Sequence, residues 1–116
     1  MPTRQRFLLS IDDLPKARGE SHELSFEGGS AESFAALLQK SLREPVLWQR
    51  WRDMQPDPDA VDPSLGLSDP DATVEAHQSD VHVSVTVITS LPHSILQHRL
   101  TLLIGRHWSL RDVSAA

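Results

Sequence analysis

The chain has 116 residues, of which 39% are hydrophobic and 5% aromatic, and its formal net charge is −5. This length suits a single domain spanning residues 1–116, and the acidic balance argues against a general affinity for phosphate backbones, which depends on clustered Lys and Arg. The absence of cysteine excludes disulfides, thiolate metal sites and thiol catalysis. No apolar run is long enough for a signal peptide or a membrane span, so the sequence predicts a cytoplasmic protein without membrane association.

The first predicted element is a strand near the N-terminus. Phe7, Leu9 and Ile11 alternate with residues of the opposite face, a period of two that is typical of a half-buried strand. Leu24 and Phe26 alternate in the same way between polar neighbours, which predicts a short second strand.

Two short helices follow. Ser30 is a favourable N-cap because its hydroxyl can accept a hydrogen bond from a free amide of the first turn, and apolar residues recur at helical spacing behind it. The pattern predicts a helix over 31–42. Pro45 suits the first turn of a second helix, over 45–54, because the missing N–H of proline is not needed there.

The segment 55–70 is rich in proline and aspartate and contains no Lys or Arg. Its composition predicts a solvated, mobile loop, and a structureless stretch of this length inside a compact domain is uncommon and is often functional. It does not have the ligand spacing of an EF-hand loop, so we expect no metal there.

Residues 73–113 are predicted to form a four-stranded antiparallel meander. Val81, Val83, Val85 and Val87 alternate with more polar residues, and the segment 96–104 offers a second alternating run. Closing this hairpin near Pro92 places Val83 opposite Leu102. A two-residue turn at 79–80 places His77 opposite His82, and a turn at 105–107 leads into a last strand over 108–113.

The predicted fold class is therefore α+β: an antiparallel sheet of five to six strands, mostly this C-terminal meander, with the two helices on its apolar face. Two alternative architectures are a small curled barrel of the Sm-like kind and a cone of the nuclear-transport-factor-2-like class. Both are analogies of shape, and a fold alone does not carry a function.

One candidate surface serves protein–protein association. Trp and Arg are enriched at protein interfaces, and the helix over 45–54 brings both types close together. Two apolar residues are predicted on the otherwise polar face of the sheet. The predicted interaction surface consists of Trp48, Arg50, Arg52, Ile88 and Leu103.

A second candidate lies on the polar face of the sheet, where two histidines are predicted to face each other beside a carboxylate. A cross-strand histidine pair can share a metal ion, but no third and fourth ligand is placed by the sequence, so we expect neither a metal nor a cofactor. The pair could instead make a contact that depends on pH between 6 and 7. This possible polar-face site consists of Glu75, His77, His82, Arg99 and Arg111.

The leading functional hypothesis is a small non-catalytic protein that acts by self-association, as a homo-oligomer, or by binding another protein. No serine or threonine is placed beside a base held by a carboxylate, as nucleophilic catalysis requires. One alternative is a ligand-binding or enzymatic cone with a pocket near His98, Arg106 and Trp108. A second is an RNA-binding Sm-like module, which would need the arginines to converge on one surface.

Overall fold

The structure, a computed structural model, describes residues 4–116. Strands and helices alternate along this part of the chain, with three short 3-10 helices in the connections. The elements in chain order are β1 (Gln5–Ile11), η1 (Leu14–Lys16), α1 (Ala31–Arg43), α2 (Val46–Asp53), η2 (Pro58–Ala60), η3 (Pro63–Gly66), β2 (Thr73–Ser79), β3 (His82–Thr89), α3 (His93–Ile104) and β4 (Ser109–Ala115).

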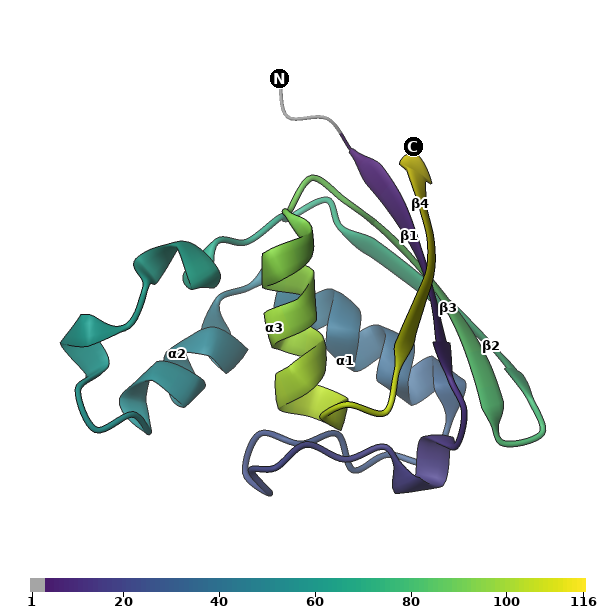
Figure 1. The fold of residues 1–116 in the computed structure, drawn as a ribbon, viewed down its shortest axis with the longest axis horizontal. Helices are drawn as coiled ribbons and strands as arrows, with labels where there is room; N and C mark the ends of the chain where they lie inside the picture. The colour runs from purple at the N-terminus through teal and green to yellow at the C-terminus, as the bar shows by residue number, and fades with distance from the viewer. Residues whose placement is uncertain (1–3) are drawn as a thin grey trace.

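The four strands form one sheet in the order β2-β3-β1-β4, and every neighbouring pair is antiparallel. The chain crosses from β1 to β2 through α1 and α2, and it crosses from β3 to β4 through α3. Each crossover skips one strand, which is the split βαβ arrangement of the ferredoxin-like topology. All three helices lie on one side of the sheet, so the molecule has two layers and one face of the sheet is left uncovered (Figure 1).

The core lies between these layers, and the sequence patterns explain it. Val83, Val85 and Val87 of β3 are buried, as their alternation predicts, and so are the corresponding residues of β1. The helices contribute residues spaced by three and four. The largest contributors to the core from β1, α1 and α3 are Phe7, Leu9, Ile11, Phe34, Leu38, Leu42, Leu96, Leu100, Leu103 and Ile104.

The predicted α+β class is confirmed, and so are the N-terminal strand and the two predicted helices. Ser30 caps α1: its hydroxyl accepts a hydrogen bond from the Ser33 N–H at 3.1 Å, and the Ser33 side chain reciprocates. The prediction of five to six strands is wrong, because the sheet has four. The sheet is open, with β2 and β4 at its edges, so the structure is neither the barrel nor the cone of the alternative predictions.

The main error is the segment 96–104, predicted as a strand, which belongs to the helix α3. Leu96, Leu100 and Ile104 are spaced by four residues, a spacing that places residues on one face in both a strand and a helix. The residues between them are not β-branched for the most part, and Pro92 precedes the first turn, where its fixed φ is compatible with a helix start. The predicted pairing of Val83 with Leu102 is therefore wrong.

The hairpin of β2 and β3 is present, but its register differs from the prediction by two residues. The turn consists of Asp80 and Val81, with Asp80 at φ 61°, and His77 lies opposite Ser84 rather than His82. A shift of two residues keeps every side chain on its predicted face, whereas a shift of one would exchange the faces.

The predicted strand at Leu24 and Phe26 is absent. Both side chains are buried from a loop, and the N–H of Phe26 donates to the carbonyl of Leu103 at the end of α3. The loop is therefore held against the helix layer and does not enter the sheet.

The segment 55–70 contains η2 and η3 and is attached to the helix layer by Arg99, whose side chain is fully buried. Its guanidinium donates to the carbonyl of Ser41 in α1 at 3.2 Å, to that of Leu65 in η3, and to that of Leu67 at 2.9 Å. Burial lowers the pKa of Arg99 to about 10, which leaves the group charged at neutral pH.

Asp69 anchors the end of the same segment to the sheet. Its carboxylate accepts hydrogen bonds from the Thr89 hydroxyl at 2.8 Å, from the Ser90 N–H at 3.1 Å and from the Asp71 N–H at 3.0 Å, and Arg4 lies 3.3 Å away. Burial acts to raise the pKa of Asp69, but the hydrogen bonds and the charge of Arg4 outweigh it, so the pKa lies below its ordinary value.

Candidate functional site

The two edges of the sheet differ in how their backbone groups are satisfied. At the β2 edge, the side chain of Gln39 on α1 accepts a hydrogen bond from the Val74 N–H at 3.0 Å, and α1 packs along the strand. At the β4 edge, all seven residues are exposed, and β4 meets no second strand among residues 4–116. An uncovered edge of this kind is a template for pairing with another chain.

The backbone direction of β4 identifies the groups that face away from β1. The N–H of Ala116 donates to the carbonyl of Arg4 at 3.1 Å, so Ala116 points toward β1. Because direction alternates along an antiparallel strand, the backbone groups of Ala115 and Val113 point toward the uncovered edge.

A β-bulge interrupts this alternation in the middle of β4. Leu8 of β1 pairs with Asp112, whereas Leu9 pairs with Leu110, so Arg111 is an extra residue in β4. Bulges of this kind place two residues of one strand opposite one residue of its neighbour. The alternation restarts beyond the bulge, and the backbone groups of Leu110 also point toward the uncovered edge.

The side chains of β4 divide between the two faces of the sheet. Leu110 and Val113 lie on the helix-facing side, in register with buried residues of β1, yet they are 39% and 40% exposed because no helix extends over them. Arg111 lies on the uncovered side, where its Nε donates to the Ser10 hydroxyl at 2.9 Å. Asp112 has no hydrogen-bond or ion-pair partner in the described part of the chain.

The predicted interaction surface is not assembled in the structure. Trp48 and Leu103 are buried, at 7% and 0% exposure, so they contribute to packing and not to a surface. Arg52 lies over the Trp48 ring at 5.1 Å, and Arg50 donates to a backbone carbonyl of the loop beside α2. Ile88 is half-buried on the uncovered face of the sheet, far from these residues in the topology.

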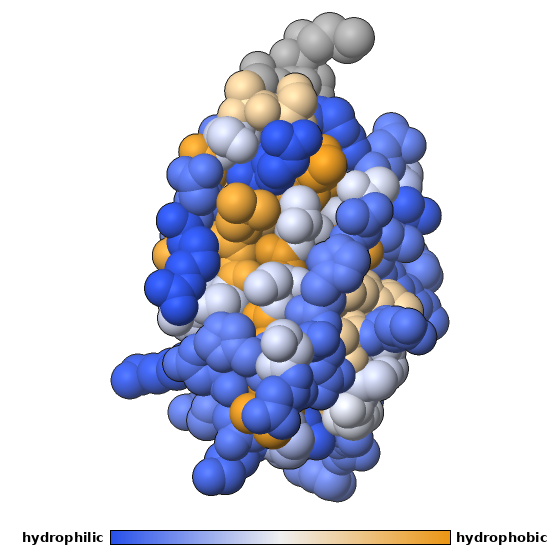
Figure 2. All heavy atoms as spheres, turned by 90° about the vertical axis from the view of Figure 1, so that its right-hand side faces the viewer, coloured by the Kyte–Doolittle hydropathy of each residue, from blue (hydrophilic) through white to orange (hydrophobic). Residues whose placement is uncertain are grey.

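The predicted polar-face site is brought together in part. Glu75, His77 and His82 lie on the uncovered face of β2 and β3, which is largely hydrophilic around a narrow apolar band (Figure 2). His82 Nδ1 is 3.6 Å from Asp12, so the two histidines have different neighbours. Arg111 lies on the same face, from β4, whereas Arg99 is buried in the helix layer and is not part of it.

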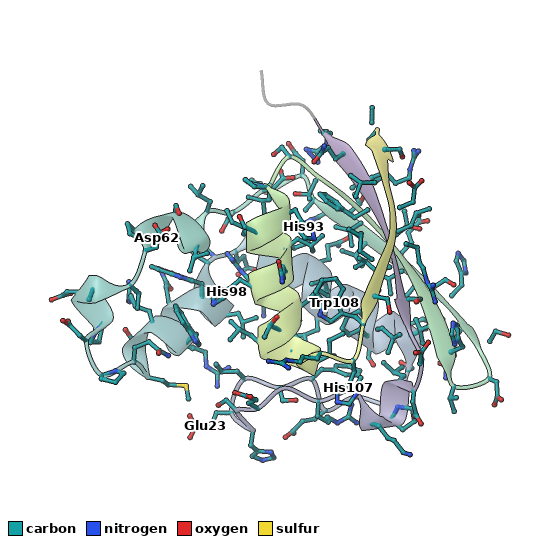
Figure 3. All side chains as sticks on the ribbon, in the orientation of Figure 1. Glu23, Asp62, His93, His98, His107 and Trp108 are labelled. Carbon is teal, nitrogen blue, oxygen red and sulfur yellow. The ribbon has the colours of Figure 1, made fainter. Side chains whose placement is uncertain are left out.

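A cleft of about 440 Å³ lies between α2, α3 and the loop at 20–24. His98 projects from α3 toward α2 and meets the Trp51 ring edge-to-face, with centroids 4.5 Å apart (Figure 3). Burial and the charge of Arg99 lower the pKa of His98, which favours the neutral imidazole at pH 7. Trp108 lies on the opposite side of α3 in the same view, so the predicted pocket shared by His98, Arg106 and Trp108 does not exist.

Within the described chain, no three His, Asp or Glu side chains gather as a metal site would require. None of the helices in residues 4–116 has both the length and the apolar composition needed to cross a membrane. Comparisons of the chain with models of protein families, with curated proteins and with solved structures give no match. The candidate site consequently depends on its geometry alone.

The sequence reasoning missed Leu110 and Val113 as surface residues. It predicted a last strand at 108–113 but paired that strand with the segment that forms α3, which assigned Leu110 to a covered face. The signal that could have found them is the pair Arg111-Asp112 between the two apolar residues, because two consecutive charges break the period of two and are compatible with a bulge.

Proposed function

We propose that this chain is a non-catalytic association module that binds a protein partner by accepting an additional strand at the uncovered edge of β4. The observation that carries the proposal is the exposure of β4 along its whole length, whereas α1 packs against β2 and Gln39 caps the outward N–H of Val74. Strand addition derives its affinity from main-chain hydrogen bonds and its specificity from alternate side chains. Leu110 and Val113 supply an apolar contact beside the backbone groups.

The environment of the histidines supports a non-catalytic role. Among the described residues, no histidine is hydrogen-bonded to a serine or threonine hydroxyl. His22 is close to Glu27, and His82 is close to Asp12, both on exposed surface. Ser25 lines the same cleft as His22 and Glu27, but its hydroxyl is hydrogen-bonded to the backbone carbonyls of Phe26 and Leu103 and not to the imidazole. The contact between base and nucleophile that an acyl-transfer site requires is therefore not made there.

RNA binding on the uncovered face is the weaker interpretation. Modules that use a four-stranded sheet for RNA present aromatic side chains on the central strands, on which bases stack. Here the central strands β1 and β3 present Arg6, Leu8, Ser10 and, from β3, His82, Ser84, Thr86 and Ile88. The arginines are also dispersed, since Arg4 binds Asp69 and Arg43 donates to a backbone carbonyl.

A peptide titration tests strand addition. We expect an unlabelled peptide of alternating Val and Thr to shift or broaden the amide resonances of Val113 and Ala115, on one side of the bulge, in the ¹⁵N-labelled protein, and to leave Ala76 on β2 unchanged. Val113→Pro should abolish these changes, because it removes an N–H that points out of the sheet, a position at which an edge strand tolerates proline.

Leu67→Lys is the matched control for that titration. Leu67 is 53% exposed, as an apolar residue of the segment 55–70, and it lies outside the sheet. The control should respond to the peptide as the unmodified protein does. Peptide-induced shifts that persist in Val113→Pro, or that appear at β2 instead of β4, would contradict strand addition at this edge.

A second candidate function is the binding of a small aromatic ligand in the cleft at His98. Two residues that line this cleft favour the binding of such a ligand, the half-exposed Trp51 and His98. The Nδ1 atom of His98 is buried and has no hydrogen-bond partner, so Nε2 is the ring nitrogen that remains for a ligand. We expect phenol to shift the indole resonance of Trp51 at pH 7, and to do so less as His98 becomes protonated, because an imidazolium accepts no hydrogen bond. No shift at either pH would remove this candidate.

A further inference from the structure

The bulge in β4 restricts which strand can pair with its edge. In a regular strand, the backbone groups that point to one side recur every two residues. In β4, the groups at Leu110 and Val113 both point to the uncovered edge, although they are three residues apart, because Arg111 is an extra residue. A regular strand can therefore form backbone hydrogen bonds with β4 on only one side of the bulge. A strand with an identical bulge can form them on both sides.

The side chains of β4 are self-complementary in one antiparallel arrangement. If the symmetry axis passes between Arg111 and Asp112, Leu110 of each copy lies opposite Val113 of the other, on the helix-facing side. Arg111 of each copy then lies opposite Asp112 of the other, on the uncovered side. Apolar residues meet apolar residues and opposite charges meet twice, as an isologous interface between identical subunits requires.

The charges disfavour a neighbouring register. Moving the axis onto Asp112 would place the two Asp112 carboxylates directly opposite each other, which is destabilising. Moving it onto Arg111 would oppose the two guanidinium groups. In the favoured arrangement, Asp112 gains the partner that it lacks within residues 4–116, and the terminal nitrogens of Arg111 remain available because only Nε contacts Ser10.

We propose that the strand which β4 accepts is β4 of a second copy of this chain, in a two-fold dimer with one continuous eight-stranded sheet. This inference rests on the proposed function, because it requires that the β4 edge accepts a strand. The contact between the two copies is limited to one pair of seven-residue strands, whereas a standard stable interface buries roughly 1,200 Å² or more. The dimer is consequently weak, and its monomer and dimer exchange.

Charge reversal with subunit mixing tests the arrangement. We expect the unmodified chain to dimerise as its concentration rises in sedimentation equilibrium, and Arg111→Asp and Asp112→Arg each to weaken dimerisation by at least about tenfold, because each variant opposes like charges twice. An equimolar mixture of the two variants should recover dimers, because every charged residue then meets its opposite. The double variant Arg111→Asp/Asp112→Arg should dimerise by itself for the same reason.

Recovery of dimers in the mixture shows that each variant is folded and that only its pairing with an identical copy is impaired, since a misfolded variant would not be rescued by the other. Dimerisation of either single variant at the level of the unmodified chain, or no recovery on mixing, would overturn the proposed arrangement. A chain that stays monomeric while the Val/Thr peptide still shifts the β4 amides would refute the dimer and leave strand addition standing. A chain that responds to neither would refute both proposals.

Discussion

Replacing Arg99 with methionine is expected to lower the free energy of unfolding by about 3 kcal/mol and to release the segment 55–70 from the helix layer. The substitution leaves the buried carbonyl of Ser41 without its donor, which costs about 1–3 kcal/mol, and it removes the part-buried hydrogen bonds that the charged guanidinium donates to the carbonyls of Leu65 and Leu67. Removing a charge that is costly to bury offsets part of this loss. Chemical denaturation at pH 7 measures the change.

Two companion variants make the Arg99 experiment specific. Arg99→Lys keeps the positive charge but offers one ammonium in place of a planar group with donors in three directions, so it should also be clearly destabilising. Arg106→Met makes the same chemical change at an exposed residue just beyond α3 and should leave stability almost unchanged. An Arg99→Lys variant as stable as the unmodified chain would show that charge alone matters and would contradict the role of the three carbonyls.

Release of the segment can be followed separately from global stability. The segment contains no Lys or Arg but several aspartates, among them Asp57, Asp59 and Asp62. A protease that cleaves at aspartate should therefore cut Arg99→Met there under conditions in which the remaining fold is intact. Cleavage that begins instead within the sheet would indicate general unfolding.

The second large effect is expected at Asp69, where Asp69→Asn should cost about 2–3 kcal/mol at neutral pH. The carboxylate accepts from Thr89, Ser90 and Asp71 and pairs with Arg4, and hydrogen bonds to charged groups contribute about 1.5–3 kcal/mol each. The asparagine side chain keeps one acceptor oxygen, but its NH₂ group faces hydrogen-bond donors and cannot accept from them. Thermal and denaturant unfolding of the two proteins give the difference.

The same substitution has a defined pH dependence. Because the folded-state pKa of Asp69 lies below its ordinary value of 3.8, its stabilising contribution is fully present above that value and is lost as the pH falls through the folded pKa. The stability difference between the unmodified chain and Asp69→Asn should therefore shrink in acid. Asp71→Asn, at an exposed neighbour, is the matched control, and a difference that stays constant down to the lowest pH would contradict the role of the charge.

Local signals in the sequence were sufficient for several elements of this fold. The N-cap at Ser30 and the apolar spacing behind it identify α1, and the valines of β3 identify a strand with one buried face. Both patterns have a single interpretation. The spacing of Leu96, Leu100 and Ile104 has two, because four residues return to the same face in a helix and in a strand, and only the packing against α1 decides between them.

The candidate site could be predicted less well, for reasons that lie outside local patterns. The burial of Arg99 depends on carbonyls from two distant segments, and its sequence neighbours do not indicate them. The exposure of Leu110 and Val113 depends on how far α3 extends over the sheet. The position of β4 at an edge follows from the skipped strand of the second crossover, and hairpin reasoning between consecutive strands does not reveal such a crossover.

The central position of β1 has a consequence for the order in which the protein assembles. Gln5 pairs with Thr89 on one side and with Ala115 on the other, so β1 is joined in the sheet by two strands that come much later in the chain. Distant pairings of this kind slow folding, because a long loop must close before any contact compensates for its lost entropy. During that interval Phe7 and Leu9 stay uncovered on the nascent chain, where early aggregation would begin.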